Sequence, residues 1–285
     1  MIPWIGLASG LGGSDPGSGE GPLFLKNRLS SLFDCKEIIE PNKKIKEIYQ
    51  SIALSNRKLA ELSFNFTKDD SFFLSIGGDH SSAIGTWSGV SSALRPKGDL
   101  GLIWFDAHMD AHTPTTSETG NIHGMPLAVL LGHGDPRLTQ ISDSLPKIKP
   151  ENLALIGIRS FESGEAALLK DLNARIYFMD EVADRGIDAV MEEALQLVNR
   201  NTAGYGFSFD LDGLDPTHIS AVGTPVPNGI DPEAFLSCLS LFQKFPPLAF
   251  ELVEYNPSLD THLKTLTFIQ KLMRSVVPQN LLIVR

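Results

Sequence analysis

Short apolar runs recur along the whole chain and alternate with segments of helical spacing. The runs are mostly continuous rather than alternating, a pattern typical of strands buried on both faces. They lie at residues 4–8, 35–39, 71–76, 100–105, 153–158, 175–179, 205–209 and 248–253. The pattern therefore predicts a sheet of about eight strands.

Between these runs, apolar residues recur every three or four positions, as on the buried face of a helix. Strand and helix alternate from end to end, which predicts the α/β class: a three-layer α/β/α fold with a mainly parallel sheet. No repeat or linker interrupts the pattern, so residues 1–285 are predicted to form a single domain, with 141–150 as a polar surface loop or short insertion. The expected helical segments are 165–172 and 187–198, with two further apolar sets: Ile45, Ile48, Ile52, Leu59, Leu62 and Leu263, Leu266, Ile269, Met273, Val276.

The composition limits the kinds of partner and the cellular setting that the protein is expected to have. The net charge is −10, which argues against nucleic acid or an anionic membrane surface and is compatible with a cationic substrate or metal ions. Cys35 and Cys238 lie far apart and outside any CxxC motif, so free thiols are expected. The first ten residues contain neither a basic segment nor a long apolar one, and no run approaches the length of a membrane span, which predicts a cytoplasmic protein.

Polar side chains with metal-binding chemistry follow one of the most apolar runs. Asp106, His108 and Asp110 come directly after Phe105, at every second position. If extended backbone continues past Phe105, these three side chains leave the chain on one side. In open parallel sheets, sites form beyond the carboxyl ends of the strands, so the ends of the other runs are the places to search.

Three further runs end in candidate chemistry. One is followed by two glycines and His80, another by Asp210 and Asp212, and the last by Glu254. Each has an ordinary interpretation alone: a turn with a hydrogen-bonded histidine, or an aspartate-rich turn. A calcium loop of the EF-hand type is excluded, because its sixth position requires glycine and carries Asp215 here.

Taken together, the strand ends predict a metal centre. Carboxylates placed side by side are costly without a compensating cation. Four carboxylates and two imidazoles are too many for one tetrahedral zinc ion, whereas they suit two hard divalent ions such as manganese, which can generate a nucleophile from water. The residues therefore indicate a binuclear metallohydrolase with the ligands His80, Asp106, His108, Asp110, Asp210 and Asp212.

The same motifs resemble those of the ureohydrolase family, which comprises arginase, agmatinase, formiminoglutamase and relatives. GGDHS (77–81), DAHMD (106–110) and SFDLDGLDP (208–216) match its three metal signatures in order and spacing. The resemblance covers nearly the whole chain, including GSGEGP (17–22), GTPVPNG (223–229) and VEYNP (253–257). The stretch 113–132, TPTTSETGNIHGMPLAVLLG, is similar to arginases in particular and makes arginase the nearest branch.

The resemblance implies a mechanism: two manganese ions per subunit and a metal-bridging hydroxide that attacks the guanidinium carbon of L-arginine, giving L-ornithine and urea. It implies that Asp106 and Asp210 bridge the ions, that Asp110 also holds the hydroxide, and that the subunits form a trimer or hexamer. One ion is expected on His80, Asp106, Asp110 and Asp210, and the other on Asp106, His108, Asp210 and Asp212.

The resemblance also implies roles for residues outside the metal ligands. His123 matches the proton-shuttle histidine, and Glu254, but not Glu251, matches the carboxylate that faces the guanidinium. The expected contacts to the rest of the substrate are His112, Ser117, Thr119, Asn121, Glu162 and Glu165.

Several of these positions depart from the arginase pattern. His112 replaces the usual asparagine, Thr119 the usual serine, and Glu162 an aspartate, while Ser160 lacks the usual carboxylate. Agmatine, guanidinobutyrate or N-formimino-L-glutamate therefore stay open as alternative substrates, with His112 or Arg159 as a basic partner for a negative substrate tail. A different class, a binding protein on an inactive scaffold, is disfavoured because all six ligands are present.

Overall fold

The computed structural model describes residues 1–282 and contains one parallel sheet, in the strand order β2-β1-β3-β8-β7-β4-β5-β6. The predicted fold class is thus confirmed, and each of the eight expected strands is present with slightly shifted bounds. The strands are β1 (Ile2–Leu7), β2 (Phe33–Ile39), β3 (Phe73–Gly77), β4 (Leu100–Phe105), β5 (Leu153–Ile158), β6 (Arg175–Phe178), β7 (Gly204–Asp210) and β8 (Ala249–Val253).

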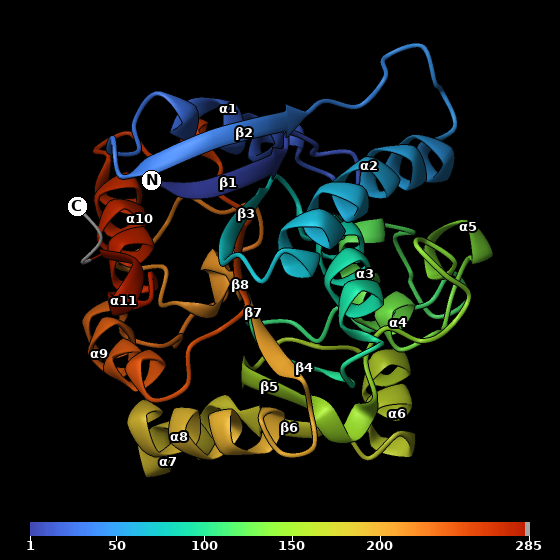
Figure 1. The fold of residues 1–285 in the computed structure, drawn as a ribbon. Helices are drawn as coiled ribbons and strands as arrows, with labels where there is room; N and C mark the ends of the chain where they lie inside the picture. Colours follow the sequence, from blue (N-terminus) through green and yellow to red (C-terminus); the bar gives the residue numbers. More distant parts are fainter. Residues whose placement is uncertain (283–285) are drawn as a thin grey trace.

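Helices cover both faces of the sheet (Figure 1). One face packs against α2 (Ile48–Lys68), α3 (Ala83–Leu94), α4 (Pro126–Leu130) and α6 (Ser163–Asp171). The other face packs against α1 (Gly21–Lys26), α7 (Met179–Arg185), α8 (Ile187–Val198), α9 (Pro232–Cys238) and α10 (Lys264–Ser275). The short helices are α5 (Pro136–Thr139) and α11 (Gln279–Leu282), with 3-10 turns at Pro16–Glu20, His80–Ser82, Ile122–Gly124, Pro150–Asn152, Leu211–Gly213, Leu239–Gln243 and Pro257–Leu259.

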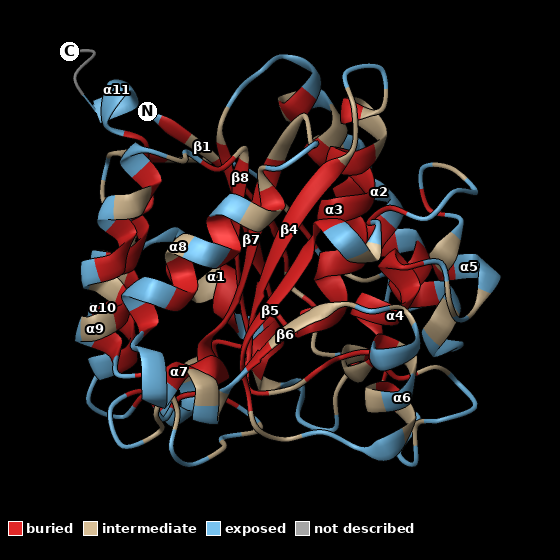
Figure 2. Cartoon of the chain, turned by 90° about the horizontal axis from the view of Figure 1, so that it is seen from below, coloured by how far each residue is buried: buried red, intermediate tan, exposed pale blue. Residues whose placement is uncertain are grey.

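The burial pattern explains why the strands were readable from the sequence. Strands β3, β4, β5 and β8 are buried at every position, so their runs are apolar without alternation. Figure 2 shows the buried strands at the centre and exposed positions on the outer sides of the helices. Among the described residues, no helix is both long enough and apolar enough to cross a membrane.

Helix α3 was not predicted, because it lacks a polar face. Ten of its twelve residues are buried, among them serines and glycines, so its sequence shows no helical period. Its partner α2 approaches closely at Gly89, where a Cβ would lie 2.2 Å from the carbonyl oxygen of Ala60. The small residues of α3 thus have two effects. They remove the helical period from its sequence, and they allow α2 and α3 to touch.

Two smaller expectations were wrong. Ile48 and Leu263 are 51% and 46% exposed and do not belong to the buried faces, since they begin or precede their helices. The stretch 141–150 is a surface loop as expected, although Ile141, Lys147 and Ile148 in it are buried. The two cysteines are free thiols as expected, Cys238 buried and Cys35 half-buried.

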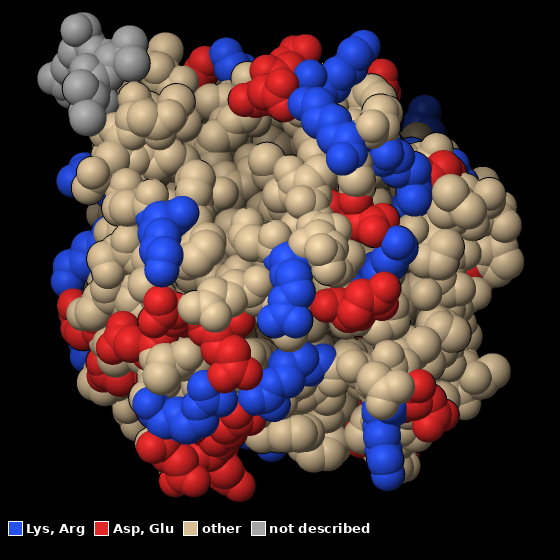
Figure 3. Space-filling model, turned by 60° about the horizontal axis from the view of Figure 1, so that its bottom comes forward, with Lys and Arg blue, Asp and Glu red and all other residues tan. Residues whose placement is uncertain are grey.

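The strand order explains how distant motifs meet. Strands β3, β8, β7, β4 and β5 are consecutive neighbours in the sheet, and all run in the same direction. Their carboxyl ends, which precede the candidate residues, therefore lie side by side along one edge. On the molecular face drawn in Figure 3, acidic and basic side chains lie in mixed groups rather than in one broad basic area.

Candidate metal centre and active site

The end of β4 supplies three acidic or imidazole side chains, but not through continued extended backbone. The strand stops at Phe105, and the Asp106 carboxylate accepts a hydrogen bond from the backbone N–H of His108 at 2.7 Å. Asp110 then adopts a left-handed conformation with φ of 49°. The condition of extended backbone past Phe105 is therefore not met, and the three side chains converge because the chain turns around the strand end.

His80 reaches the same place from the end of β3. A sharp bend precedes it at Gly78, where a Cβ would lie 2.1 Å from the carbonyl oxygen of Ser9, so only glycine fits. The buried Asp79 carboxylate fixes the turn by accepting hydrogen bonds from the backbone N–H groups of Gly12 (2.8 Å) and Ser81 (2.9 Å). This bend aims the imidazole across the sheet edge.

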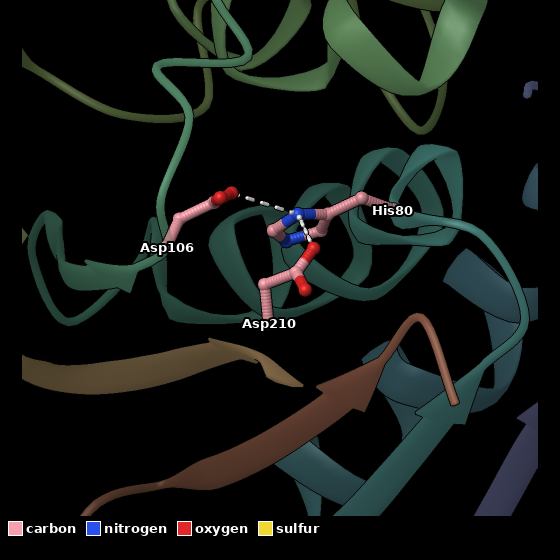
Figure 4. Close-up of side chains that lie close together, drawn as sticks. All are labelled: His80, Asp106 and Asp210. Atoms are coloured by element: carbon pink, nitrogen blue, oxygen red, sulfur yellow. Dashed lines mark ion pairs between the residues drawn. The ribbon is translucent and has the colours of Figure 1, made fainter. Parts of the chain in front are cut away.

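Three carboxylates surround one nitrogen of His80. Its Nδ1 lies 3.1 Å from Asp106 Oδ2, 3.0 Å from Asp110 Oδ2 and 3.1 Å from Asp210 Oδ2. Figure 4 shows Asp106 and Asp210 approaching this nitrogen from different sides. Within the described part of the chain, this buried nitrogen has no aligned hydrogen-bond partner. A lone pair that meets three carboxylates without a hydrogen bond is the donor set expected around a cation.

A second group forms around His108. Its Nδ1 lies 3.1 Å from Asp212 Oδ2 and 3.5 Å from Asp106 Oδ1. Asp212 is held by the Thr224 hydroxyl at 3.1 Å, while its backbone N–H donates to Asp210 Oδ1 at 2.8 Å. The candidate ligand atoms of each group, His80–Asp106–Asp210 and Asp106–His108–Asp212, lie within 4.8 Å of one another, and Asp106 belongs to both.

The electrostatics of these residues call for positive charge. Burial and the carboxylates of Asp212 and Asp106 raise the pKa of Asp210 well above its ordinary value, and burial raises the pKa of Asp110 to about 6. Burial lowers the pKa of His80, but its three carboxylate neighbours outweigh burial and raise that pKa overall. The protein alone therefore favours protons in this cluster, and divalent cations can take the place of those protons.

A second histidine and a glutamate lie beside this centre. Glu254 follows β8 in a left-handed conformation with φ of 66°, and its Oε1 accepts the backbone N–H of His80 at 2.8 Å. The same oxygen lies 3.2 Å from Nδ1 of His123. Burial lowers the pKa of His123, but Glu254 outweighs burial and raises it to about 9. His123 is itself placed by its backbone N–H, which donates to the carbonyl of Gly12 at 3.0 Å.

The centre opens into a cavity of about 250 Å³. Its lining is dominated by acidic residues and histidines, and none of the described residues that line it is a Lys or Arg. All the expected substrate contacts lie on its wall. The lining includes His112, Ser117, Glu118, Thr119, Asn121, His123, Glu162, Glu165, Thr224 and Glu254, together with His108, Asp110, Asp210 and Asp212.

His112 has partners at both ring nitrogens. Nε2 lies 2.8 Å from Glu162 Oε2, and Nδ1 lies 3.2 Å from the Thr116 hydroxyl. Glu165 is buried behind this pair, where burial raises its pKa to about 7, and it receives the backbone N–H of Ala111 at 3.2 Å. His112 therefore contacts Glu162, and its contact with a substrate stays a prediction.

Comparison with known proteins identifies the family of the chain. The sequence profile of the arginase family matches residues 20–278. The chain belongs to the arginase family. The arginase of Bacillus caldovelox is 43% identical over 234 residues, 82% of this chain and 77% of that protein. The arginase of Bacillus subtilis is 40% identical over 99% of each chain.

A solved arginase has the same fold. The structure of Entamoeba histolytica arginase in complex with L-ornithine superposes with a TM-score of 0.86 and 31% identity, covering 96% of this chain and 97% of that one. The expected resemblance to the ureohydrolases, nearest to arginase, is thus confirmed for the whole sheet and its helical layers.

One residue of this arginase-family chain does not take the role considered for it. Arg159 was a possible partner for a negative substrate tail, but its guanidinium donates to backbone carbonyls, among them those of Asp212 (2.8 Å) and Val226 (2.8 Å). It does not line the cavity. Arg159 instead ties the turn after β7 to a neighbouring loop.

Two residues that support the metal ligands of this arginase-family site, Trp104 and Asp79, were not among the predicted site residues. Trp104 donates its indole N–H to Asp106 Oδ2 at 2.9 Å and stacks on His80 with ring centroids 4.1 Å apart. Asp79 was visible in the GGDHS motif, and its position between glycines and a ligand was the available signal. Trp104 gave no signal, since it stands within an apolar strand.

Proposed function

We propose that this chain is a metal-dependent hydrolase that converts L-arginine to L-ornithine and urea. The observation that carries the proposal is the His80 nitrogen surrounded by three carboxylates at the base of an acidic cavity. Such a cavity attracts a cationic guanidinium group. The arginases to which the chain is similar, one of them solved in complex with L-ornithine, support this substrate.

Two manganese ions per chain fit the donor set. His80, Asp106, Asp110 and Asp210 would hold one ion, and Asp106, His108, Asp210 and Asp212 the other, with Asp106 and Asp210 shared. A carboxylate-rich set of this kind suits manganese. Bound there, the ions would lower the pKa of water enough to supply a nucleophile at neutral pH.

Residues beside the metal ligands bind the guanidinium and handle protons. Asp110 holds the attacking water by a hydrogen bond, and the Glu254 carboxylate pairs with the guanidinium. His123 is anchored through Nδ1 on Glu254, which leaves Nε2 to carry a proton to the leaving amine. The left-handed backbone at Asp110 and Glu254 is the kind of local strain that accumulates at functional sites.

The cavity wall suits the zwitterionic end of an amino acid. The hydroxyl oxygens of Ser117 and Thr119 each accept a backbone N–H, at 3.0 and 3.2 Å, so their hydrogens can donate to the substrate carboxylate. The Asn121 amide adds a further donor. We expect the α-amino group of the substrate to lie near Glu162 and Glu165, which line the same cavity.

The same chemistry on agmatine or guanidinobutyrate is the second candidate. It is favoured by the engagement of Glu162 with His112, which leaves Glu162 less available to an α-amino group. N-formimino-L-glutamate is less suited, because it carries two carboxylates and the described lining offers no Lys or Arg.

Product analysis with the manganese-loaded protein tests the assignment. Urea release is measured from arginine, agmatine and guanidinobutyrate, and glutamate formation from N-formimino-L-glutamate, at equal substrate concentrations. We expect kcat/KM for arginine to exceed the others by at least about tenfold, corresponding to about 1.4 kcal/mol. A value for arginine no better than for agmatine would reject the arginase assignment.

A matched variant separates an active enzyme from an inactive scaffold. Asp210→Ala removes a shared metal ligand and is expected to abolish both metal uptake and turnover. A wild-type protein that takes up no manganese, and in which Asp210→Ala changes nothing, would favour a binding protein.

The proposal extends to the setting of the enzyme. We propose a cytoplasmic location and a single domain over residues 1–285, both expected from the sequence pattern, and a homo-oligomer of three or six chains, as the family resemblance implies. Sedimentation velocity of the manganese-loaded protein measures the number of chains.

A further inference from the structure

A buried glutamate in the sheet has no role in the proposed reaction. Glu251 lies on β8 with no exposed surface, and its register neighbours are Ser75 on β3 and Ser208 on β7. A carboxylate in the middle of a sheet is costly to bury unless it is hydrogen-bonded. Glu251 was distinguished from Glu254 in the sequence and given no function.

Each carboxylate oxygen of Glu251 receives hydrogen bonds. Oε1 accepts from the Thr86 hydroxyl at 2.7 Å, and Oε2 accepts from the Trp87 indole N–H and the Ser208 hydroxyl, both at 2.8 Å. An indole N–H can only donate, so Oε2 must act as an acceptor. An ionised carboxylate can only accept, so with Glu251 ionised the single hydroxyl hydrogen of Ser208 points to Oε2.

The direction of this hydrogen determines the protonation of a metal ligand. Ser208 Oγ also lies 3.0 Å from Nε2 of His80. Because the serine hydrogen already points to Glu251, Ser208 can only accept here, and Nε2 of His80 must carry a hydrogen. Nδ1 is then the ring nitrogen whose lone pair can face Asp106, Asp110 and Asp210.

We propose that Glu251, acting through Ser208, is a positioning residue that fixes the metal-binding tautomer of His80 and increases the donor strength of its Nδ1. A negative charge at the far end of the chain Glu251–Ser208–His80 pulls on the Nε2 hydrogen and makes the ring a stronger ligand. Trp104, stacked on the ring at an interplanar angle of 8°, fixes its plane from another side. The inference rests on the proposed metal centre.

The variant Glu251→Gln tests whether the negative charge of Glu251 strengthens His80 as a ligand. Its amide oxygen can still accept from Trp87 and Ser208, so the packing and the orientation are kept while the negative charge is lost. We expect manganese affinity at the His80 group to fall 10–100-fold, the range typical when such supporting groups are changed. Affinity at the His108 group should stay within about twofold, since Glu251 contacts no residue of that group.

Titration of manganese into metal-free protein, followed by electron paramagnetic resonance of the free ion, gives both affinities without reference to turnover. The control is Asp260→Asn, another buried carboxylate, which accepts from the Tyr255 hydroxyl at 2.9 Å and the Leu266 N–H at 2.8 Å. It should lower stability and leave both affinities unchanged, as a merely structural acid does.

The outcomes are distinguishable. Wild-type protein that binds no manganese rejects the proposed function itself. Normal binding in wild type with equal affinities in Glu251→Gln, or an equal loss at both groups, overturns the positioning role alone. If Glu251→Gln does not fold, Ser208→Ala replaces it: a loss at the His80 group supports the inference, and unchanged affinity overturns it.

Discussion

At the scale of single residues, the site includes two residues with a backbone conformation that residues other than glycine rarely adopt. Asp110 and Glu254 both have positive φ and are not glycines, and such positions cost about 1–2 kcal/mol each. The rest of the fold holds them there, through the Leu127 N–H on the Asp110 carbonyl (2.9 Å) and the Glu254 N–H on Gly78 (2.8 Å). The strained conformation serves the site, because both carboxylates face the cavity.

The contact between His123 and Glu254 predicts a pH dependence of stability. The pKa of His123 is raised to about 9 in the folded chain against about 6.5 when unfolded, so its stabilisation is present below pH 6.5 and is lost as the pH rises through 9. In metal-free protein, His123→Gln should therefore lower the free energy of unfolding by about 3 kcal/mol more at pH 6 than at pH 10. Urea denaturation at the two pH values measures this, and an equal effect at both would contradict it.

The identity of the ligands was predictable from the sequence, whereas their support was not. Asp106, His108 and Asp110 could be found because they follow a buried strand at regular spacing. Ser208 and Trp104 could not, because their partners depend on which strands are neighbours and on hydrogen directions. The same limit applies to His112, whose link to Glu162 joins two loops fifty positions apart.

At the scale of elements, the surface loop 141–150 is anchored by a buried lysine. Lys147 is buried there, and its ammonium group donates to the carbonyls of Leu145 (2.6 Å), Asp143 (2.7 Å) and Thr139 (3.2 Å) and to the Asp143 carboxylate (3.0 Å). Arg95 at the end of α3 pairs with the same carboxylate at 3.0 Å. The buried ammonium group of Lys147 thus holds this polar, proline-containing segment in place.

Lys147→Met should destabilise the protein by about 2–4 kcal/mol, because it leaves several buried acceptors without a donor. Lys149→Met is the matched control two residues away, since that side chain is 56% exposed and pairs with Asp99 at the surface. We expect the control to unfold like wild type. Thermal denaturation of both variants checks this, and equal midpoints for the two would refute the anchoring role.

The elements themselves were predictable wherever burial follows a period. All eight strands, and helices such as α8, could be predicted, because their apolar residues form continuous runs or recur at a regular spacing. Helix α3 did not follow, since a helix packed on all sides with serine and glycine has no period to detect. The strand order was also beyond the sequence, because it depends on which crossovers pack best.

At the scale of the whole molecule, the metal centre joins distant parts of the chain. Its residues come from β3, β4 and β7, and their supporting groups from β8 and the loop at Gly12. Carboxylates and imidazoles from several strand ends repel or hold protons when no cation is present, as the raised pKa values of Asp210 and Asp110 indicate. Metal binding should therefore stabilise the sheet as a unit rather than one loop.

Chelation provides the measurement. If residues 1–285 form one domain, unfolding should be a single transition with and without metal, and manganese at about a hundredfold its Kd should add about 2.7 kcal/mol per ion to the free energy of unfolding. The denaturant dependence should stay unchanged, because the same surface is exposed in both cases. Asp210→Ala serves as the control, since it should unfold alike with and without manganese. Two separate transitions, of which manganese shifts only one, would show instead that the site stabilises part of the chain and that the sheet does not unfold as one unit.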